Sequence, residues 1–240
     1  MRAIILAAGR GSRMGALTDA LPKCRTVLHG KELIEWQLGS LRDAGIEDIA
    51  IVRGYLAETF TFDLPYFENN RWAETNMVMS LLAADKWLSA DTCIAAYSDI
   101  VYSQDAVSRL LSAAGDITVT YDPNWLTLWS ARFEDPLSDA ETFKLRGDQV
   151  IEIGNRAESI EEIDGQYMGL VKYTPTGWRQ IRDYLEGLSA PKRDKLDMTA
   201  LLQGLIEADV PVHGTPIADR WYEVDSMQDL FAYRRNWFPE

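Results

Sequence analysis

The clearest structural signal in this chain is LAAGRGSRMGALTDALPKC, residues 6–24, which follows the apolar start MRAII. It contains three glycines, two arginines and a lysine. Residues 3–8 predict a short buried strand, and glycines directly after a strand let the backbone approach a ligand and point N–H groups at an anion. The stretch therefore predicts a phosphate-binding loop, although a tight turn with surface cations explains the same residues.

The rest of the chain alternates between predicted strands and helices. Apolar runs predict strands at 3–8, 46–54, 91–100 and 116–122, and helical spacing predicts helices at 32–45, 76–90 and 103–115. Such repeats predict an α/β fold with a mostly parallel central sheet and helices on both faces. Later elements are expected as antiparallel strands at 149–155 and 165–174, helices at 178–188 and 196–209, a strand within 210–217 and a closing helix from Met227.

The segment 123–170 interrupts this alternation. It begins with a stretch that is polar, aromatic and only weakly periodic, NWLTLWSARFEDPLSDAETFK. No repeat, low-complexity tract or Pro/Ser-rich linker separates the segment from its neighbours. We therefore expect a single domain over residues 1–240, with 123–170 inserted as a lid.

Composition limits the functions open to this chain. Of its 240 residues, 47% are hydrophobic, which is enough to form the core of one large domain. The 37 acidic residues outnumber the 24 basic ones, for a net charge of -13. This balance argues against binding to nucleic acid, because such binding needs clustered Lys and Arg. The basic residues that do cluster, in the first loop, therefore stand out.

The N-terminus MRAIILAAGRG lacks the long apolar region and the cleavage site of a signal peptide. No stretch reaches the roughly 18 apolar residues that a membrane span needs. We therefore expect a cytoplasmic protein that does not insert into membranes. Cys24 and Cys93 are too few and too far apart for a disulfide framework or a zinc site, so both are expected to be buried thiols.

Several motifs give the chain a family resemblance. LAAGRGSRM followed by LPK resembles the signature of nucleotidyltransferases, which join a nucleoside triphosphate to a phosphorylated acceptor and release pyrophosphate. The resemblance continues through NNRWAETNMVMSL, YSDI, GQYMGL and WYEVDS, and the chain looks most like small cytidylyltransferases acting on phosphocholine or 2-aminoethylphosphonate. It implies a Rossmann-like three-layer sandwich, CTP as the nucleotide and Mg²⁺ as the cofactor. Such enzymes often form homodimers, and WFPE, residues 237–240, is a candidate contact.

The resemblance and the loop chemistry together indicate a nucleotide site. Its expected lining is Leu6, Ala7, Ala8, Gly9 and Gly11. Arg13 and Lys23 are expected to be catalytic, because their charges would offset charge on the departing pyrophosphate. Asn76 offers hydrogen bonds to a pyrimidine or ribose, and Ser80 lies one turn further on the same helical face. A helix N-cap and a packing residue are the structural alternatives for these two.

Two aspartates are candidates for the metal site. Mg²⁺ commonly takes one or two carboxylates together with substrate phosphates. Asp99 follows the strand CIAAYS and Asp225 ends WYEVD, and ligands sit at strand ends in open α/β sheets. An Asp in either place is also a common helix cap. The resemblance places one metal carboxylate after a central strand and another near the C-terminus, which favours Asp99 and Asp225 as the metal pair.

The segment after residue 122 suggests what the acceptor carries. Trp125 and Trp129 are four residues apart, and several carboxylates lie near them in the sequence. Aromatic faces with carboxylates suit an ammonium group, although ordinary packing explains the same tryptophans. Arg132 suits a phosphate or carboxylate instead. Further residues that would complete an acceptor site are Tyr97, Tyr167, Trp221 and Glu223.

The preferred function is a magnesium-dependent cytidylyltransferase for an amine-bearing phosphate or phosphonate. An acceptor oxygen would attack the α-phosphorus of CTP in line, and because a phosphate is already anionic near neutral pH, no histidine base is needed. Lys144 is a third catalytic candidate, with a surface lysine as the alternative. Two other functions remain open: transfer to a sugar 1-phosphate or to another phosphorylated molecule such as phosphoglutamine, and a nucleotide-binding module that has lost catalysis.

Overall fold

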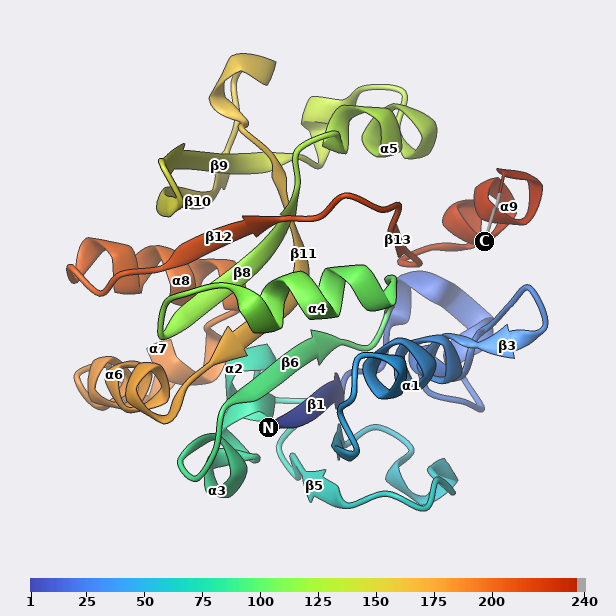
Figure 1. Ribbon diagram of the computed structural model, residues 1–240. Helices are drawn as coiled ribbons and strands as arrows, with labels where there is room; N and C mark the ends of the chain where they lie inside the picture. Colours follow the sequence, from blue (N-terminus) through green and yellow to red (C-terminus); the bar gives the residue numbers. More distant parts are fainter. Residues whose placement is uncertain (237–240) are drawn as a thin grey trace.

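The computed structural model describes residues 1–236, and within them a sheet of nine strands lies between two layers of helices (Figure 1). Its strand order is β5 (Tyr66–Glu68), β4 (Asp48–Arg53), β1 (Arg2–Ala7), β6 (Cys93–Tyr97), β11 (Gln166–Tyr173), β8 (Ile117–Asp122), β12 (His213–Pro216), β10 (Gln149–Arg156) and β9 (Glu141–Arg146). β10 and β11 run against the direction of the others. The sheet is therefore mixed and largely parallel, which confirms the predicted fold class.

Strand β1 shows how the two layers form. Ile5 and its neighbours on the same face pack with α1 (Leu33–Asp43) and α4 (Gln104–Ser112), which lie together on one side in Figure 1. Ile4 and Leu6 point to the opposite face, because successive strand residues alternate. The helices that pack on that face are α2 (Met77–Leu82), α3 (Asp85–Leu88), α6 (Pro175–Glu186) and α8 (Met198–Glu207). Burial on both faces explains why β1 reads as a continuous apolar run.

Two predicted elements are each divided in the structure. The helix expected over 76–90 forms α2 and α3, because the N–H groups of Ala83 and Ala84 bond three residues back and tighten the chain between them. The strand expected over 91–100 ends at Tyr97 and resumes as β7 (Ile100–Val101). The break leaves Asp99 in the turn at the carboxyl end of β6.

The segment 123–170, expected as an inserted lid, divides into strands of the sheet and outer connections. β11 lies between β6 and β8 near the middle of the sheet, and β9 and β10 form one edge. The parts outside the sheet are 157–165 and 123–140, which holds α5 (Trp125–Arg132) and a 3-10 turn at Pro136–Ser138. A lid role stays a prediction for these connections.

The C-terminal part of the described chain packs against the N-terminal loops. β13 (Tyr222–Glu223) pairs antiparallel with β7, and α9 (Met227–Asn236) follows it. A separate apolar cluster packs Met14 and Leu28 against Val224 and Leu230. Leu28 lies just before the hairpin strand β3 (Lys31–Glu32). Sequence positions near the two ends of the chain therefore meet in one place. The remaining strand is β2 (Val27–Leu28) and the remaining α-helix is α7 (Ala190–Lys195).

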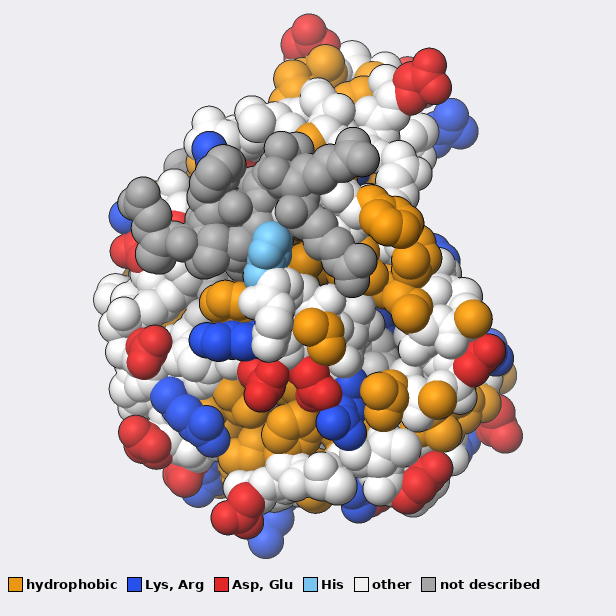
Figure 2. Space-filling view, turned by 90° about the vertical axis from the view of Figure 1, so that its right-hand side faces the viewer, with side chains coloured by type: hydrophobic (Ala, Val, Ile, Leu, Met, Phe, Trp, Pro, Cys, Tyr) orange, Lys and Arg blue, Asp and Glu red, His pale blue; other side chains and the backbone are white. Residues whose placement is uncertain are grey.

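Four features bear on the predicted partners and chemistry of the protein: its surface charge, its helix lengths, its cysteines and its candidate dimer contact. On the face shown in Figure 2, acidic and basic side chains are interspersed and do not gather into a patch of one sign. Among the described residues, no helix is both long and apolar enough to cross a bilayer. Cys24 and Cys93 are buried free thiols, as predicted. The candidate dimer contact, residues 237–240, lies outside the described part of the chain.

Candidate active site

The loop that follows β1 folds back so that the Lys23 side chain packs against Gly11. Gly11 has a φ of +67°, which favours glycine, and a Cβ there would lie 2.8 Å from the Cβ and Cδ of Lys23. The hydroxyl of Thr18, which is fully buried, donates to the Gly11 carbonyl at 3.3 Å and holds the loop closed. A side chain at position 11 would therefore displace Lys23.

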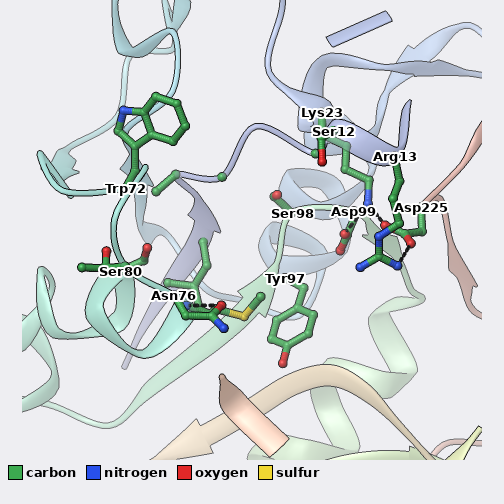
Figure 3. A pocket seen from close by; sticks show the side chains of 16 residues that line it. Ser12, Arg13, Lys23, Trp72, Asn76, Ser80, Tyr97, Ser98, Asp99 and Asp225 are labelled. Atoms are coloured by element: carbon green, nitrogen blue, oxygen red, sulfur yellow. Dashed lines mark hydrogen bonds and ion pairs between the residues drawn. The ribbon is translucent and has the colours of Figure 1, made fainter. Parts of the chain in front are cut away.

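Lys23 bridges two carboxylates from distant parts of the chain. Its side chain is 7% exposed, and its Nζ lies 2.7 Å from Asp99 Oδ2 and 2.6 Å from Asp225 Oδ1 (Figure 3). Arg13 Nη1 donates to the other oxygen of Asp225. Burial by itself lowers the pKa of Lys23, but the charges of Asp99 and Asp225 outweigh burial, and the pKa lies above its ordinary value. Lys23 is therefore a fixed cation at neutral pH.

Backbone pairing holds the two aspartates together. β13 and β7 pair Glu223 with Ile100, and the N–H of Val224 donates to the Asp99 carbonyl at 2.8 Å. Asp225 follows directly, so its side chain leaves the backbone beside Asp99. The short β13–β7 ladder thus brings together the carboxylates of Asp99 and Asp225, which are far apart in the sequence.

These groups line one end of a pocket of about 290 Å³. Figure 3 shows Lys23, Arg13, Asp99 and Asp225 at one end and Trp72, Asn76 and Ser80 at the other. The predicted residues that line the pocket are Leu6, Ala8, Gly9, Gly11, Arg13, Lys23, Asn76, Ser80, Tyr97, Asp99 and Asp225. The pocket also has lining residues that the sequence analysis did not single out: Ser12, Trp72, Thr75, Met77 and Ser98. These five residues lie inside the family motifs LAAGRGSRM, NNRWAETNMVMSL and YSDI, and that position is the feature of the sequence that could have identified them.

Asn76 and Ser80 line the pocket and also have structural partners. Asn76 Oδ1 accepts from the Met77 N–H at 2.8 Å, which caps α2, and its Nδ2 donates to the Lys195 carbonyl at 3.2 Å. Ser80 Oγ accepts from Asn69 Nδ2 at 3.0 Å. Both structural alternatives are therefore present, and a contact of either residue with a nucleotide base stays a prediction.

The aromatic residues expected at the acceptor lie in two places. Tyr97 lines the pocket, and the Tyr167 ring packs against it with 5.7 Å between centroids. Trp125 and Trp129 are 3% and 4% exposed and pack in the core with Trp221, whose Nε1 donates to Asp122. The structure brings Tyr97 to the pocket, with Tyr167 packed behind it and outside the lining, and it places the three tryptophans in the interior.

Three other predicted site residues do not line the pocket. Ala7 faces the α1 layer, on the opposite side of the sheet from Leu6. Lys144 Nζ lies 3.0 Å from Glu152 and 3.7 Å from Glu162. The carboxylate of Glu223 accepts from Arg132, and burial raises the pKa of Glu223 although the Arg132 charge acts in the opposite direction.

A second hollow of about 940 Å³ lies between residues 135–141 and 154–158. Its lining includes four carboxylates, those of Asp135, Asp139, Glu141 and Glu158, and one arginine, Arg156. Burial raises the pKa of Glu141, and also that of Tyr167, to which the Glu141 charge contributes. The Glu141 carboxylate of this hollow therefore acts on Tyr167, the ring that packs against Tyr97 of the pocket.

The aspartate pair offers oxygen ligands of the kind that a magnesium ion takes, and both oxygens of Asp225 also accept from Lys23 and Arg13. Asp99 Oδ1 is buried and has no hydrogen-bond partner among the described residues, so this oxygen is available as a ligand. No group of three or more His, Cys, Asp and Glu gathers as a metal site in the described part of the chain. The protein would therefore supply two carboxylates, and substrate phosphates and water the remaining oxygens, which is a common arrangement for Mg²⁺.

Comparison with known proteins gives relatives over the full length. Residues 3–153 match the MobA-like NTP transferase domain. The chain is 36% identical, over 96% of its length and 98% of the relative, to a CTP:phosphoglutamine cytidylyltransferase of Campylobacter jejuni. It is 34% identical to a 2-aminoethylphosphonate cytidylyltransferase of Lancefieldella rimae over 44% of this chain and 45% of that protein. A solved CTP:phosphocholine cytidylyltransferase from Streptococcus pneumoniae has a TM-score of 0.68 at 21% identity, with 98% of each chain covered, and supports the fold alone.

Proposed function

The chain belongs to the MobA-like NTP transferase domain family, and from this premise we propose that it is a magnesium-dependent cytidylyltransferase that transfers CMP from CTP to phosphoglutamine. The observation that carries the proposal is the bridge from Lys23 to Asp99 and Asp225 beside the glycine loop. The choice of acceptor rests on the full-length similarity to a CTP:phosphoglutamine cytidylyltransferase. That similarity favours a phosphorylated amino-acid amide over phosphocholine and 2-aminoethylphosphonate.

The nucleotide would lie along the pocket, with its triphosphate at the loop and its base toward α2. Gly9 and Gly11 leave the loop backbone open to phosphate oxygens, and Lys23 and Arg13 provide positive charge at the same end. Asn76 and Ser80 line the other end, where a pyrimidine base would be read by hydrogen bonds. When bound at Asp99 and Asp225, Mg²⁺ would neutralise phosphate charge and orient the α-phosphate.

The reaction needs positioning more than proton transfer. An oxygen of the acceptor phosphate forms a bond to the α-phosphorus, and the bond from that phosphorus to the oxygen of the β-phosphate breaks, so pyrophosphate leaves with the electron pair. Lys23 and Arg13 offset the charge that develops on this leaving group. Neither His29 nor His213 lines the pocket. His29 Nε2 donates to the Tyr233 carbonyl, and His213 pairs with Asp148. Because the acceptor phosphate is already anionic near neutral pH, the reaction does not need a histidine base in the pocket.

The acceptor would lie on the side of Tyr97 and Tyr167. A phosphorylated amino-acid amide carries an ammonium group, and the neighbouring acidic hollow with Glu141 suits a cation. Lys144 is a weaker candidate for the acceptor phosphate, because Glu152 and Glu162 already pair with its ammonium.

The test is release of pyrophosphate by the purified full chain with CTP and Mg²⁺. The acceptor panel is phosphoglutamine, phosphocholine, 2-aminoethylphosphonate, phosphoethanolamine and glucose 1-phosphate, and Lys23→Met serves as the inactive control. We expect the highest kcat/KM with phosphoglutamine. A higher value with another acceptor would contradict the proposed acceptor and leave the chemistry intact. CTP binding with no turnover of any acceptor would favour the alternative of a nucleotide-binding module without catalysis.

A further inference from the structure

A buried arginine connects helix α5 to the strand that precedes Asp225. The side chain of Arg132 is 3% exposed. Its Nη1 donates to Glu223 Oε2 at 2.7 Å, and its Nε donates to Asp229 Oδ1 at 2.9 Å. The two acceptors flank Asp225 in the sequence. Because a guanidinium is planar and donates in fixed directions, it sets the spacing of these two carboxylates.

Asp229 extends this constraint to the backbone of Asp225. Its Oδ2 accepts from the N–H of Asp225 at 3.0 Å, from the N–H of Ser226 at 2.8 Å and from the Ser226 hydroxyl at 3.0 Å. The side chain of Asp229 is 5% exposed, so these bonds are shielded from water. The backbone that carries the Asp225 side chain is therefore held by the β13–β7 ladder before it and by Asp229 after it.

Helix α5 holds Arg132 in place. The guanidinium carbon lies 5.4 Å from the Trp129 ring centroid and 4.9 Å from that of Phe133, and the Arg132 carbonyl accepts from Gln228 Nε2 at 3.3 Å. A buried ion network is not required for stability, since apolar residues of similar volume often serve as well. The location of this network, with one carboxylate on each side of Asp225, indicates a role in placing Asp225.

We propose that Arg132 is a positioning residue for Asp225. Through Glu223 and Asp229, it holds the Asp225 carboxylate where that carboxylate pairs with Lys23 and would bind a divalent cation. The inference rests on the proposed role of Asp225 as a metal ligand. Partners that orient metal ligands typically change metal affinity or activity by about 10- to 100-fold when they are replaced.

The experiment compares Arg132→Lys, which keeps the charge but loses the fork, with Asp229→Asn. The matched control is Arg109→Met, because Arg109 is an exposed arginine of α4 that pairs with Asp105. For each full-length variant, Mn²⁺ binding in the presence of CTP and without acceptor is measured by electron paramagnetic resonance, and kcat is measured with Mg²⁺. We expect both network variants to bind Mn²⁺ about 10- to 100-fold more weakly and to lose kcat, with a KM for CTP near the wild-type value. The control should match the wild type.

Wild-type Mn²⁺ affinity and kcat in the folded network variants would overturn the inference. If Arg132→Lys does not fold, Asp229→Asn decides, because it retains the size of the side chain and keeps Arg132. Asp225→Asn separates this inference from the proposed function. Equal Mn²⁺ binding by wild type and Asp225→Asn would overturn the metal role of Asp225 and the positioning role with it. Weaker binding in Asp225→Asn but not in Arg132→Lys and Asp229→Asn would overturn the positioning role alone.

Discussion

The Nζ of Lys23 lies 2.6 Å from Asp225 Oδ1, although 202 positions separate the two residues in the chain. The contact depends on packing between the first loop and the C-terminal part, where Met14 and Leu28 meet Val224 and Leu230. It also depends on the β13–β7 ladder, which brings Asp99 to the same ammonium group. The charged end of the pocket is thus built from three segments that only the folded chain brings together.

Replacement of Lys23 by Met should remove the fixed cation while it keeps an unbranched stem of similar length. Loss of one preorganised group that stabilises developing charge costs about 100- to 1000-fold in turnover, so we expect kcat/KM for CTP to fall at least that far with every acceptor. Pyrophosphate release measures the change, and Lys192→Met on the exposed part of α7 is the control. A loss confined to one acceptor would contradict a role at the triphosphate.

Asp99→Asn and Asp225→Asn should each reduce turnover by orders of magnitude with little change in circular dichroism, because a metal ligand acts mainly on the transition state. Chelation of divalent cations with EDTA should abolish wild-type activity, and added Mg²⁺ should restore it. Near-normal turnover of either variant would remove that aspartate from the metal pair.

Trp129→Ala separates the two interpretations of the tryptophan segment. Because Trp129 is buried against Trp125 and Trp221, we expect the free energy of unfolding to fall by about 3–5 kcal/mol. The acceptor KM of the protein that remains folded should stay near the wild-type value. Urea denaturation and steady-state kinetics measure the two quantities, and a rise in acceptor KM without loss of stability would restore the cation-binding interpretation.

The two cysteines should be unreactive in the native protein. Burial raises the pKa of Cys24 and of Cys93 to about 12, so about one thiol in ten thousand is a thiolate at pH 8. Titration with a chromogenic disulfide should therefore detect no fast-reacting thiol before denaturation and two thiols after it. Rapid reaction of one thiol in the native state would show that its side chain is accessible.

Local sequence patterns predicted the elements that local forces control. The apolar run of β1 and the helical spacing in α1 and α4 depend on neighbouring residues, and the structure has these elements within two or three residues of the expected bounds. The breaks after Leu82 and Tyr97 were not predicted, because they depend on backbone hydrogen bonds that composition does not reveal. The position of β11 at the middle of the sheet is likewise a matter of long-range pairing.

The sequence by itself determined the α/β alternation, the glycine loop and the chemical groups of the candidate site, because these follow from residue type, short spacing and a specific motif. Only the tertiary structure decided which of those groups meet. Tryptophans beside carboxylates in sequence suggested a cation site, yet burial in the core is the better place for such large apolar surfaces. Conversely, the sequence suggested a phosphate or carboxylate contact for Arg132, and the fold enclosed it between the carboxylates of Glu223 and Asp229, because a buried guanidinium must be paired and hydrogen-bonded.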